Sequence, residues 1–275
     1  MKIAAVQMKI SHTNPKINMG KVENYIKQAA KQKVDVIVFP EDMLTGAIFG
    51  DHSKLLSKKE FCNFFQNLAK QYHLDIVPGT YTEKIGDKFY NTTHYIDYQG
   101  KVLATYHKIN LYLCERGQAT AGKKVAVFKT RFGQAGLAIC WDITSPEILR
   151  AMAKQGVEIV YCPSYWWKEI AKTGLKLNNQ AEEIKVDAIC QARTFENNLT
   201  FVYANAAGAM KDRGNETDTL IGHSQIITPI LGRVAFANHN RETMLVREVD
   251  LKLNKEAEKN YLHRGDIDRL KNILK

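Results

Sequence analysis

Three residues with reactive side chains stand at the ends of separate strand-like stretches of this 275-residue chain. Cys140 closes the apolar run 136–140, Glu41 closes the run 34–41, and Lys108 follows a third stretch. A thiol can attack an electrophilic carbon, a glutamate can take up and return its proton, and an ammonium group can stabilise the resulting oxyanion. Together these residue types predict covalent chemistry at a carbonyl-like carbon, with the backbone N–H of Trp141 as a second oxyanion donor.

Each residue alone has a more ordinary explanation. A free cysteine at the end of an apolar strand is most often a small buried hydrophobic residue. A glutamate after Phe-Pro is usually a solvated loop acid, and a lysine at a strand end is usually a surface cation. A thiol with a pKa of about 8.5 also needs a nearby base or cation to react at neutral pH. The chemistry therefore depends on whether the fold brings the three side chains together.

The stretch around Cys140 predicts a buried strand that leads into a helix. Ser145 is a good N-cap residue, Pro146 suits the first helical position, and Glu147 places a negative charge in the first turn. We therefore expect Cys140 to lie beyond the carboxyl end of a strand, where α/β folds commonly place their chemistry.

The remaining pattern alternates strands and helices. Asn14-Pro15 predicts a helix start, and a second helix is expected over about 58–72. The β-branched run 34–41 predicts a strand that is buried on both faces. Further strands are expected at 2–9, 74–80 and 125–129, a hairpin at 91–107, and a loop at 42–52.

An internal repeat predicts two similar halves. Ala30–Pro40 reads AKQKVDVIVFP and Ala153–Pro163 reads AKQGVEIVYCP. The strand at 74–80 has a counterpart at 199–205, and the turn at Gly100 has one at Gly232. Chance similarity of two buried βα units is the alternative. The repeat favours an α/β fold in which two halves form a four-layer α-β-β-α sandwich, as one domain over 1–251. The charged segment 252–275 is expected to form a helical C-terminal arm.

Composition limits the class of protein. Hydrophobic residues make up 45% of the chain, and no apolar run approaches the about 18 residues that a membrane span needs. The chain enters a strand pattern directly after Met1, so we expect no signal peptide. An odd number of cysteines, five, predicts reduced thiols in a cytoplasmic protein. The net charge of +10 is spread among acidic residues, which favours a solvated surface over a nucleic-acid or membrane site. The histidines show no metal-ligand spacing.

Several motifs resemble the nitrilase superfamily, also called carbon–nitrogen hydrolases. They are Phe39-Pro40-Glu41, Tyr106-His107-Lys108, Glu115, and Cys140-Trp141-Asp142 followed by Pro146-Glu147. The resemblance covers nearly the whole chain. It implies the α-β-β-α sandwich, with Glu41 as general base, Lys108 as oxyanion stabiliser, Cys140 as nucleophile and Glu115 as the second, structurally placed glutamate. It also implies no metal or organic cofactor, and a homodimer or larger homo-oligomer whose interface includes the C-terminal arm.

The resemblance implies hydrolysis of a non-peptide C–N bond in a small molecule through a Cys140 thioester, with release of ammonia. An amide is the leading substrate class and an N-carbamoyl amine is next, since Cys140-Trp141-Asp142 resembles the N-carbamoylputrescine hydrolase branch. Tyr165, Trp166 and Trp167 are expected to line the pocket, with ordinary loop packing as the alternative. Nitrile hydrolysis, acyl transfer to an amine, and a non-catalytic nitrilase-like binding protein remain open.

Overall fold

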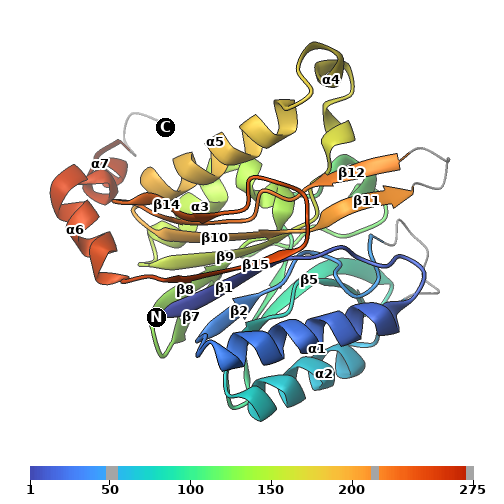
Figure 1. The fold of residues 1–275 in the computed structure, drawn as a ribbon. Coiled ribbons are helices and arrows are strands. Elements are labelled where there is room, and N and C mark those ends of the chain that lie inside the picture. Colours follow the sequence, from blue (N-terminus) through green and yellow to red (C-terminus); the bar gives the residue numbers. More distant parts are fainter. Residues whose placement is uncertain (48–54, 212–216, 271–275) are drawn as a thin grey trace.

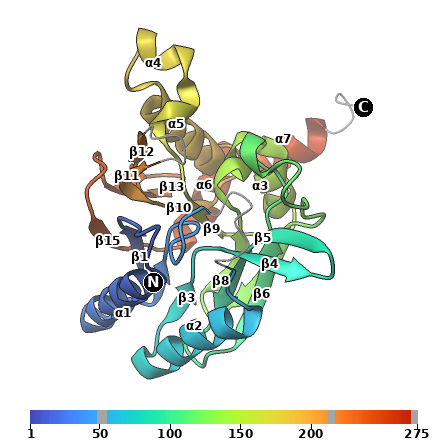
Figure 2. The same ribbon diagram turned by 90° about the vertical axis from the view of Figure 1, so that its right-hand side faces the viewer.

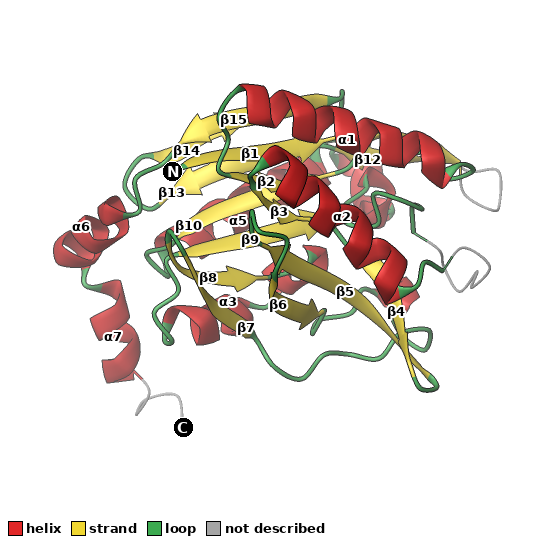
Figure 3. Cartoon of the chain, turned by 90° about the horizontal axis from the view of Figure 1, so that it is seen from below, coloured by secondary structure: helices red, strands yellow, loops and turns green. Residues whose placement is uncertain are grey.

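Two β-sheets lie face to face, and helices cover both outer sides (Figures 1 and 3). This computed structural model describes residues 1–47, 55–211 and 217–270. The arrangement confirms the predicted α/β fold with four α-β-β-α layers. Within the described residues, no helix is both long and apolar enough to cross a membrane.

The first sheet has the strand order β15-β1-β2-β3-β5-β4, with β6 paired to β5. Its strands are β1 (Lys2–Gln7), β2 (Val36–Val38), β3 (Asp75–Val77), β4 (Tyr81–Ile85), β5 (Lys88–Ile96), β6 (Val102–His107) and β15 (Thr243–Glu248). Two helices lie side by side on its outer face (Figure 3), α1 (Pro15–Lys31) and α2 (Lys58–Tyr72).

The second sheet has the order β14-β13-β10-β9-β8-β7. Its strands are β7 (Ala126–Thr130), β8 (Gly133–Leu137), β9 (Ile159–Ser164), β10 (Thr200–Asn205), β13 (Gln225–Thr228) and β14 (Gly232–Phe236). Helices α3 (Pro146–Ala153) and α5 (Ala181–Phe195) cover it. The short α4 (Thr173–Leu177) projects above α5 (Figure 2), and β11 (Ala207–Lys211) pairs with β12 (Thr217–Ile221) as a separate ribbon.

The two sheets repeat the same topology, as the internal repeat predicts. In the first, β1, β2 and β3 are parallel, and β5 and β6 continue antiparallel. In the second, β8, β9 and β10 are parallel, and β13 and β14 continue antiparallel. The strand that follows each half joins the other sheet, since β7 pairs with β8 and β15 pairs with β1. This exchange ties the halves into one body.

Burial of β2 on both faces explains its apolar sequence. Val36 and Val38 belong to the core between the two sheets, whereas Ile37 and Phe39 belong to the core beneath α1 and α2. All four side chains are fully buried. A strand covered on both sides has no polar face, which is why the run lacks alternation.

Local signals set the helix boundaries that lead to the site. The Asn14 side chain accepts a hydrogen bond from the Lys16 N–H, and Pro15 begins α1. Ser57 and Glu60 form a capping box at the start of α2, whose bounds agree with the prediction. Residues 42–47 of the expected loop form no helix or strand, and its remainder, 48–52, lies outside the described residues.

The C-terminal segment forms α6 (Lys252–Tyr261) and α7 (His263–Leu270) at one end of the sandwich (Figure 1). Asn254 of α6 is buried and donates from Nδ2 to the Glu158 carbonyl at 2.6 Å. Arg264 of α7 donates to the Val157 carbonyl at 2.7 Å. These contacts hold both helices against the second sheet.

Candidate active site

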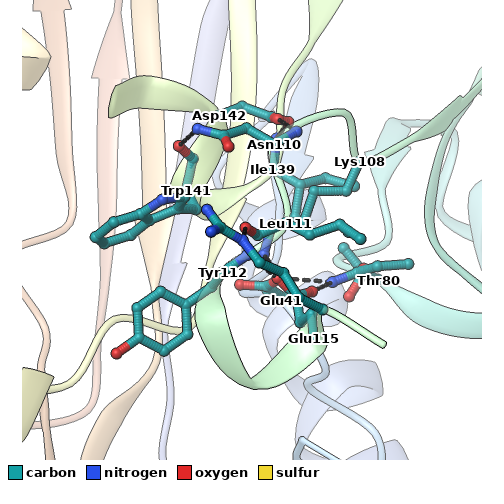
Figure 4. Close-up of polar contacts among 12 residues, drawn as sticks. Glu41, Thr80, Lys108, Asn110, Leu111, Tyr112, Glu115, Ile139, Trp141 and Asp142 are labelled. Carbon is teal, nitrogen blue, oxygen red and sulfur yellow. Dashed lines mark hydrogen bonds and ion pairs between the residues drawn. The ribbon is translucent and has the colours of Figure 1, made fainter. Parts of the chain in front are cut away.

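Glu41, Lys108 and Cys140 meet in one cavity of about 80 Å³ at the ends of β2, β6 and β8. All three side chains are buried, with exposed fractions of 3%, 2% and 6%. Glu115, in the short turn Leu113–Glu115, lines the same cavity. The structure therefore brings together the four residues that the sequence singled out (Figure 4 shows the two glutamates and Lys108).

Lys108 lies between the two glutamates. Its Nζ is 2.9 Å from Glu41 Oε1 and 2.8 Å from Glu115 Oε2. Burial alone would lower the pKa of Lys108, but the two carboxylate charges outweigh it and raise this pKa well above its usual value. The ammonium group is therefore charged at neutral pH and held at a fixed point.

Asn91 in β5 also bridges the two glutamates, a contact that the sequence analysis missed. Its Nδ2 donates to Glu41 Oε1 at 2.7 Å and to Glu115 Oε1 at 2.9 Å. The Asn91 carbonyl also accepts from the Lys108 backbone N–H at 2.9 Å. Nothing in the sequence around Asn91 distinguishes it from any other polar residue of a hairpin.

The reactive thiol sits in a strained turn. The strand was predicted to run to residue 140, but β8 ends three residues earlier, at Leu137. Cys140 instead begins a 3₁₀ turn, Cys140–Thr144, and has a φ of +43°. A positive φ is costly for a residue with a Cβ and needs support from the surrounding structure. Such a sharp turn presents the side chain to the cavity.

Asp142 supplies that support. Its Oδ2 accepts from the Ile139 N–H at 2.8 Å and from the Tyr106 hydroxyl at 2.8 Å. Its Oδ1 accepts from the Asn110 N–H at 2.8 Å (Figure 4). The buried carboxylate thus ties the nucleophile turn to the chain on both sides of Lys108. Burial raises the pKa of Asp142 to about 6, against the lowering effect of these hydrogen bonds.

Ser145 has a different partner from the one predicted. It occupies the N-cap position of α3 and Pro146 begins the helix, but its side chain makes no capping hydrogen bond. Its hydroxyl accepts instead from Asn110 Nδ2 at 2.9 Å. The same amide donates to the Trp141 carbonyl at 3.1 Å and to Thr144 Oγ1 at 3.0 Å. The Ser145 hydroxyl is therefore used to bind Asn110, which holds the turn Cys140–Thr144 in place, rather than to cap α3.

The charges around Cys140 define its resting state. Burial and the Glu41 carboxylate raise the pKa of the thiol well above its usual value, although Lys108 lowers it. Burial also raises the pKa of Glu41, partly offset by Lys108 and by a hydrogen bond with the thiol. The thiol therefore rests protonated beside a carboxylate, and a base is needed to make it nucleophilic.

Aromatic side chains form part of the cavity wall. Tyr112 packs edge-on against Trp141 and Trp167, with ring centroids 4.8 and 5.1 Å apart. Tyr165 also lines the cavity and lies edge-on to Trp167, with ring centroids 6.4 Å apart. Trp166 is not among the lining residues, contrary to expectation. It is buried, stacks on Trp141, and donates from Nε1 to Glu182 at 2.8 Å.

Asp42, next to Glu41 in the sequence, is a second lining residue that the sequence analysis missed. Its φ is +52°, and its Oδ1 accepts from the Thr80 hydroxyl at 3.1 Å. Burial and the neighbouring Glu41 raise its pKa well above its usual value. Gly79 allows this strand end to pack closely, since a Cβ there would lie 2.0 Å from the Pro40 carbonyl oxygen.

Among the described residues, no group of three or more His, Cys, Asp and Glu side chains is arranged to hold a metal ion. All five cysteines are free thiols.

Comparison with known proteins gives consistent matches along the whole chain. The model of the carbon–nitrogen hydrolase family matches residues 2–259. A protein of Schizosaccharomyces pombe named "Probable nitrilase" is 28% identical over 94% of this chain and 92% of its own. The 2-oxoglutaramate amidase of Bacillus subtilis is 27% identical over 93% of each chain. A carbon–nitrogen hydrolase structure from Helicobacter pylori has a TM-score of 0.86 at 21% identity, covering 100% of this chain and 98% of that one, which shows a shared fold.

Proposed function

The chain belongs to the carbon–nitrogen hydrolase family, and we propose that it hydrolyses a small amide through a thioester on Cys140. The observation that carries the proposal is the meeting of Glu41, Lys108 and Cys140 in one buried cavity. A protonated thiol, a neighbouring carboxylate and a fixed cation are the groups that acyl transfer to sulfur requires.

Acylation uses these groups in order. Glu41 takes the thiol proton as the Cys140 sulfur attacks the carbonyl carbon, and the carbonyl oxygen becomes an oxyanion. The Lys108 ammonium and the Trp141 backbone N–H stabilise that negative charge. Glu41 then returns the proton to the amide nitrogen, the C–N bond breaks, and ammonia leaves. The acyl group remains on sulfur as a thioester.

Deacylation runs the same sequence with water. Glu41 takes a proton from a water molecule, whose oxygen attacks the thioester carbon. The second oxyanion is stabilised as the first was. Collapse breaks the C–S bond, the thiolate regains a proton from Glu41, and the carboxylic acid is released. Glu115 holds Lys108 in place through both halves of the cycle.

The size of the cavity and its aromatic lining favour a small substrate with an apolar or flat portion. The cavity holds about 80 Å³, and Tyr112, Trp141, Tyr165 and Trp167 supply its wall. The similarity to a protein named 2-oxoglutaramate amidase supports an amide, and the similarity to a protein named probable nitrilase keeps a nitrile as the alternative. An N-carbamoyl amine is the second substrate class, because the same attack at its carbonyl would release ammonia and carbon dioxide with the free amine.

The test is a panel of small primary amides, N-carbamoyl amines and nitriles, scored for ammonia release by the wild type and Cys140→Ala. Turnover of amides by the wild type alone supports the proposal. Preference for nitriles, or transfer of the acyl group to added hydroxylamine without hydrolysis, would favour those reactions instead. If no compound is turned over and Cys140 carries no acyl adduct, the chain is better described as a binding protein of this fold.

We also propose a homodimer whose interface includes the C-terminal helices, and a reducing cytoplasmic setting. Tyr261 and Leu262, at the junction of α6 and α7, are 42% and 61% exposed, which leaves apolar surface for a partner copy. Five free thiols fit a reducing compartment. Light scattering of the full chain and of Leu262→Glu tests the interface, since a monomeric wild type contradicts it.

A further inference from the structure

Four side chains contact one another at the centre of the site, and Asn91 is the uncharged one. The other three are Glu41, Glu115 and Lys108. Lys108 bridges Glu41 and Glu115 with a charged group, and Asn91 bridges the same pair with a neutral amide. Two carboxylates close together in a buried site repel one another, so N–H donors that bind both stabilise their ionised forms. Asn91 does this without adding a charge that would oppose proton uptake by Glu41.

The contacts on Glu41 are unequal. Lys108 Nζ and Asn91 Nδ2 both bind Oε1, at 2.9 and 2.7 Å. Among the described residues, no N–H group donates a hydrogen bond to Glu41 Oε2. Because both N–H donors hold Oε1, Oε2 is left as the oxygen with the higher proton affinity.

The orientation of the Asn91 amide is fixed by chemistry. Carboxylates only accept hydrogen bonds, so the NH₂ group must face them. The cost falls on Oδ1, a buried acceptor with no hydrogen-bond partner among the described residues. An unsatisfied buried acceptor is unfavourable and is usually retained only where the arrangement serves another purpose. Here both N–H groups of the amide are committed to the two glutamates.

We propose that Asn91 is a positioning residue that holds Glu41 by Oε1 and thereby aims Oε2 at the Cys140 thiol. This inference rests on the proposed function, and it adds a fourth polar residue to the Glu41, Lys108 and Cys140 set. Asn91 lines the same cavity as these three residues, and its amide N–H groups bind the two glutamates rather than the sulfur. It acts by setting which oxygen of Glu41 is the base and how readily that oxygen takes a proton.

The test compares Asn91→Leu and Asn91→Asp with a matched control, Thr93→Val. Thr93 lies two residues along the same strand, is fully buried, and has a hydroxyl with no partner among the described residues. Thr93→Val therefore perturbs the same strand without touching a carboxylate. Circular dichroism and thermal unfolding of each variant show that the comparison is made on folded protein.

Asn91→Leu removes hydrogen bonds to ionised groups, so kcat should fall roughly 10- to 100-fold while KM changes by less than about threefold. Loss of a bond to the ionised form raises the pKa of Glu41, and the base works only when ionised. The acid limb of the kcat profile should therefore move to higher pH by about one unit. Asn91→Asp adds a third negative charge and should move the acid limb further to higher pH. Thr93→Val should leave the acid limb unchanged.

An acid limb that stays at the wild-type pH in both Asn91 variants would overturn the proposal, even if activity falls, because a structural defect alone lowers rate without moving the profile. The rate of Cys140 alkylation by iodoacetamide against pH gives the same comparison without a substrate. If the wild type turns over no amide, the proposed function fails. A shifted alkylation profile in Asn91→Leu would then still support the positioning role.

Discussion

The backbone N–H of Glu41 donates to the carbonyl oxygen of Ser164 at 3.1 Å, across the gap between the two sheets. These two residues occupy the same position in the two halves of the repeat, directly after Phe39-Pro40 and Cys162-Pro163. The halves therefore meet at equivalent strand ends. The Ser164 hydroxyl and the Tyr165 backbone also hydrogen-bond the Cys140 thiol, which lowers the pKa of this thiol against the larger effect of burial. One half carries Glu41, the proposed base, and the other holds Cys140, the proposed nucleophile.

Replacing Lys108 should separate its catalytic role from its structural one. Lys108→Met leaves Glu41 and Glu115 buried without their shared cation, which should cost about 3–5 kcal/mol of unfolding free energy. Loss of one oxyanion donor should also lower kcat by about 10²–10³-fold. Urea unfolding and steady-state kinetics measure the two effects. The exposed Lys124→Met is the control, and a Lys108→Met enzyme with near wild-type kcat would contradict the assigned role.

The buried carboxylate of Asp142 predicts a pH-dependent stability. Its pKa is raised to about 6 in the folded protein, above its ordinary value of about 3.8. A folded pKa above the unfolded one means that the native state holds the proton more tightly. The stabilising contribution is therefore complete below about pH 4 and is lost as pH rises through 6.

The matched comparison is with Asp142→Asn. In the wild type both carboxylate oxygens accept hydrogen bonds, and in the variant an NH₂ group replaces one of these acceptors. The variant should therefore lose about 2–3 kcal/mol of unfolding free energy. It also lacks the titration. The stability difference between wild type and variant, measured by urea unfolding, should shrink by about 1–2 kcal/mol between pH 4.5 and 7. A difference that is constant across this range would show that Asp142 does not titrate there.

Two neighbouring tryptophans should respond differently to substitution. Trp167 lines the cavity, so Trp167→Ala should raise KM several-fold for the larger amides of the panel and change kcat little. Trp166 lies behind the wall and binds Glu182, so Trp166→Phe should leave KM near wild type and lower unfolding free energy by about 1–3 kcal/mol. Equal KM effects in both variants would contradict this assignment of the wall.

The sequence predicts most of the fold because the repeat and the periodicities agree. The helix over 58–72 has both a capping box and an apolar face, and the β-branched run at Val36–Val38 has no polar face to expose. The exchange of β7 and β15 between the sheets was not predicted, since edge pairing depends on contacts far apart in the chain.

For the site, the sequence identifies charged and nucleophilic residues that belong to recognisable motifs, but it does not identify their supports. Glu41, Lys108, Glu115 and Cys140 were predicted and lie together. Asn91 was not, because its role exists only where β5 passes between two glutamates from other segments. Trp166 was misplaced because adjacent residues after a strand end can face opposite ways, and its indole N–H found a buried partner in Glu182.

We propose that Glu41 and Lys108 act on the Cys140 thiol as one unit. The most direct measurement treats the folded protein with a substoichiometric amount of iodoacetamide near neutral pH and maps the alkylated cysteine by mass spectrometry. Cys62 and Cys114 serve as internal controls in the same sample. Burial raises the pKa of both thiols, and Cys114 is a half-buried residue of the same cavity that also feels Glu115, Lys108 and Glu41. We expect selective labelling of Cys140, with a rate that changes in both Glu41→Gln and Lys108→Ala. Labelling of Cys140 no faster than of Cys62 or Cys114, unaffected by either substitution, would contradict it.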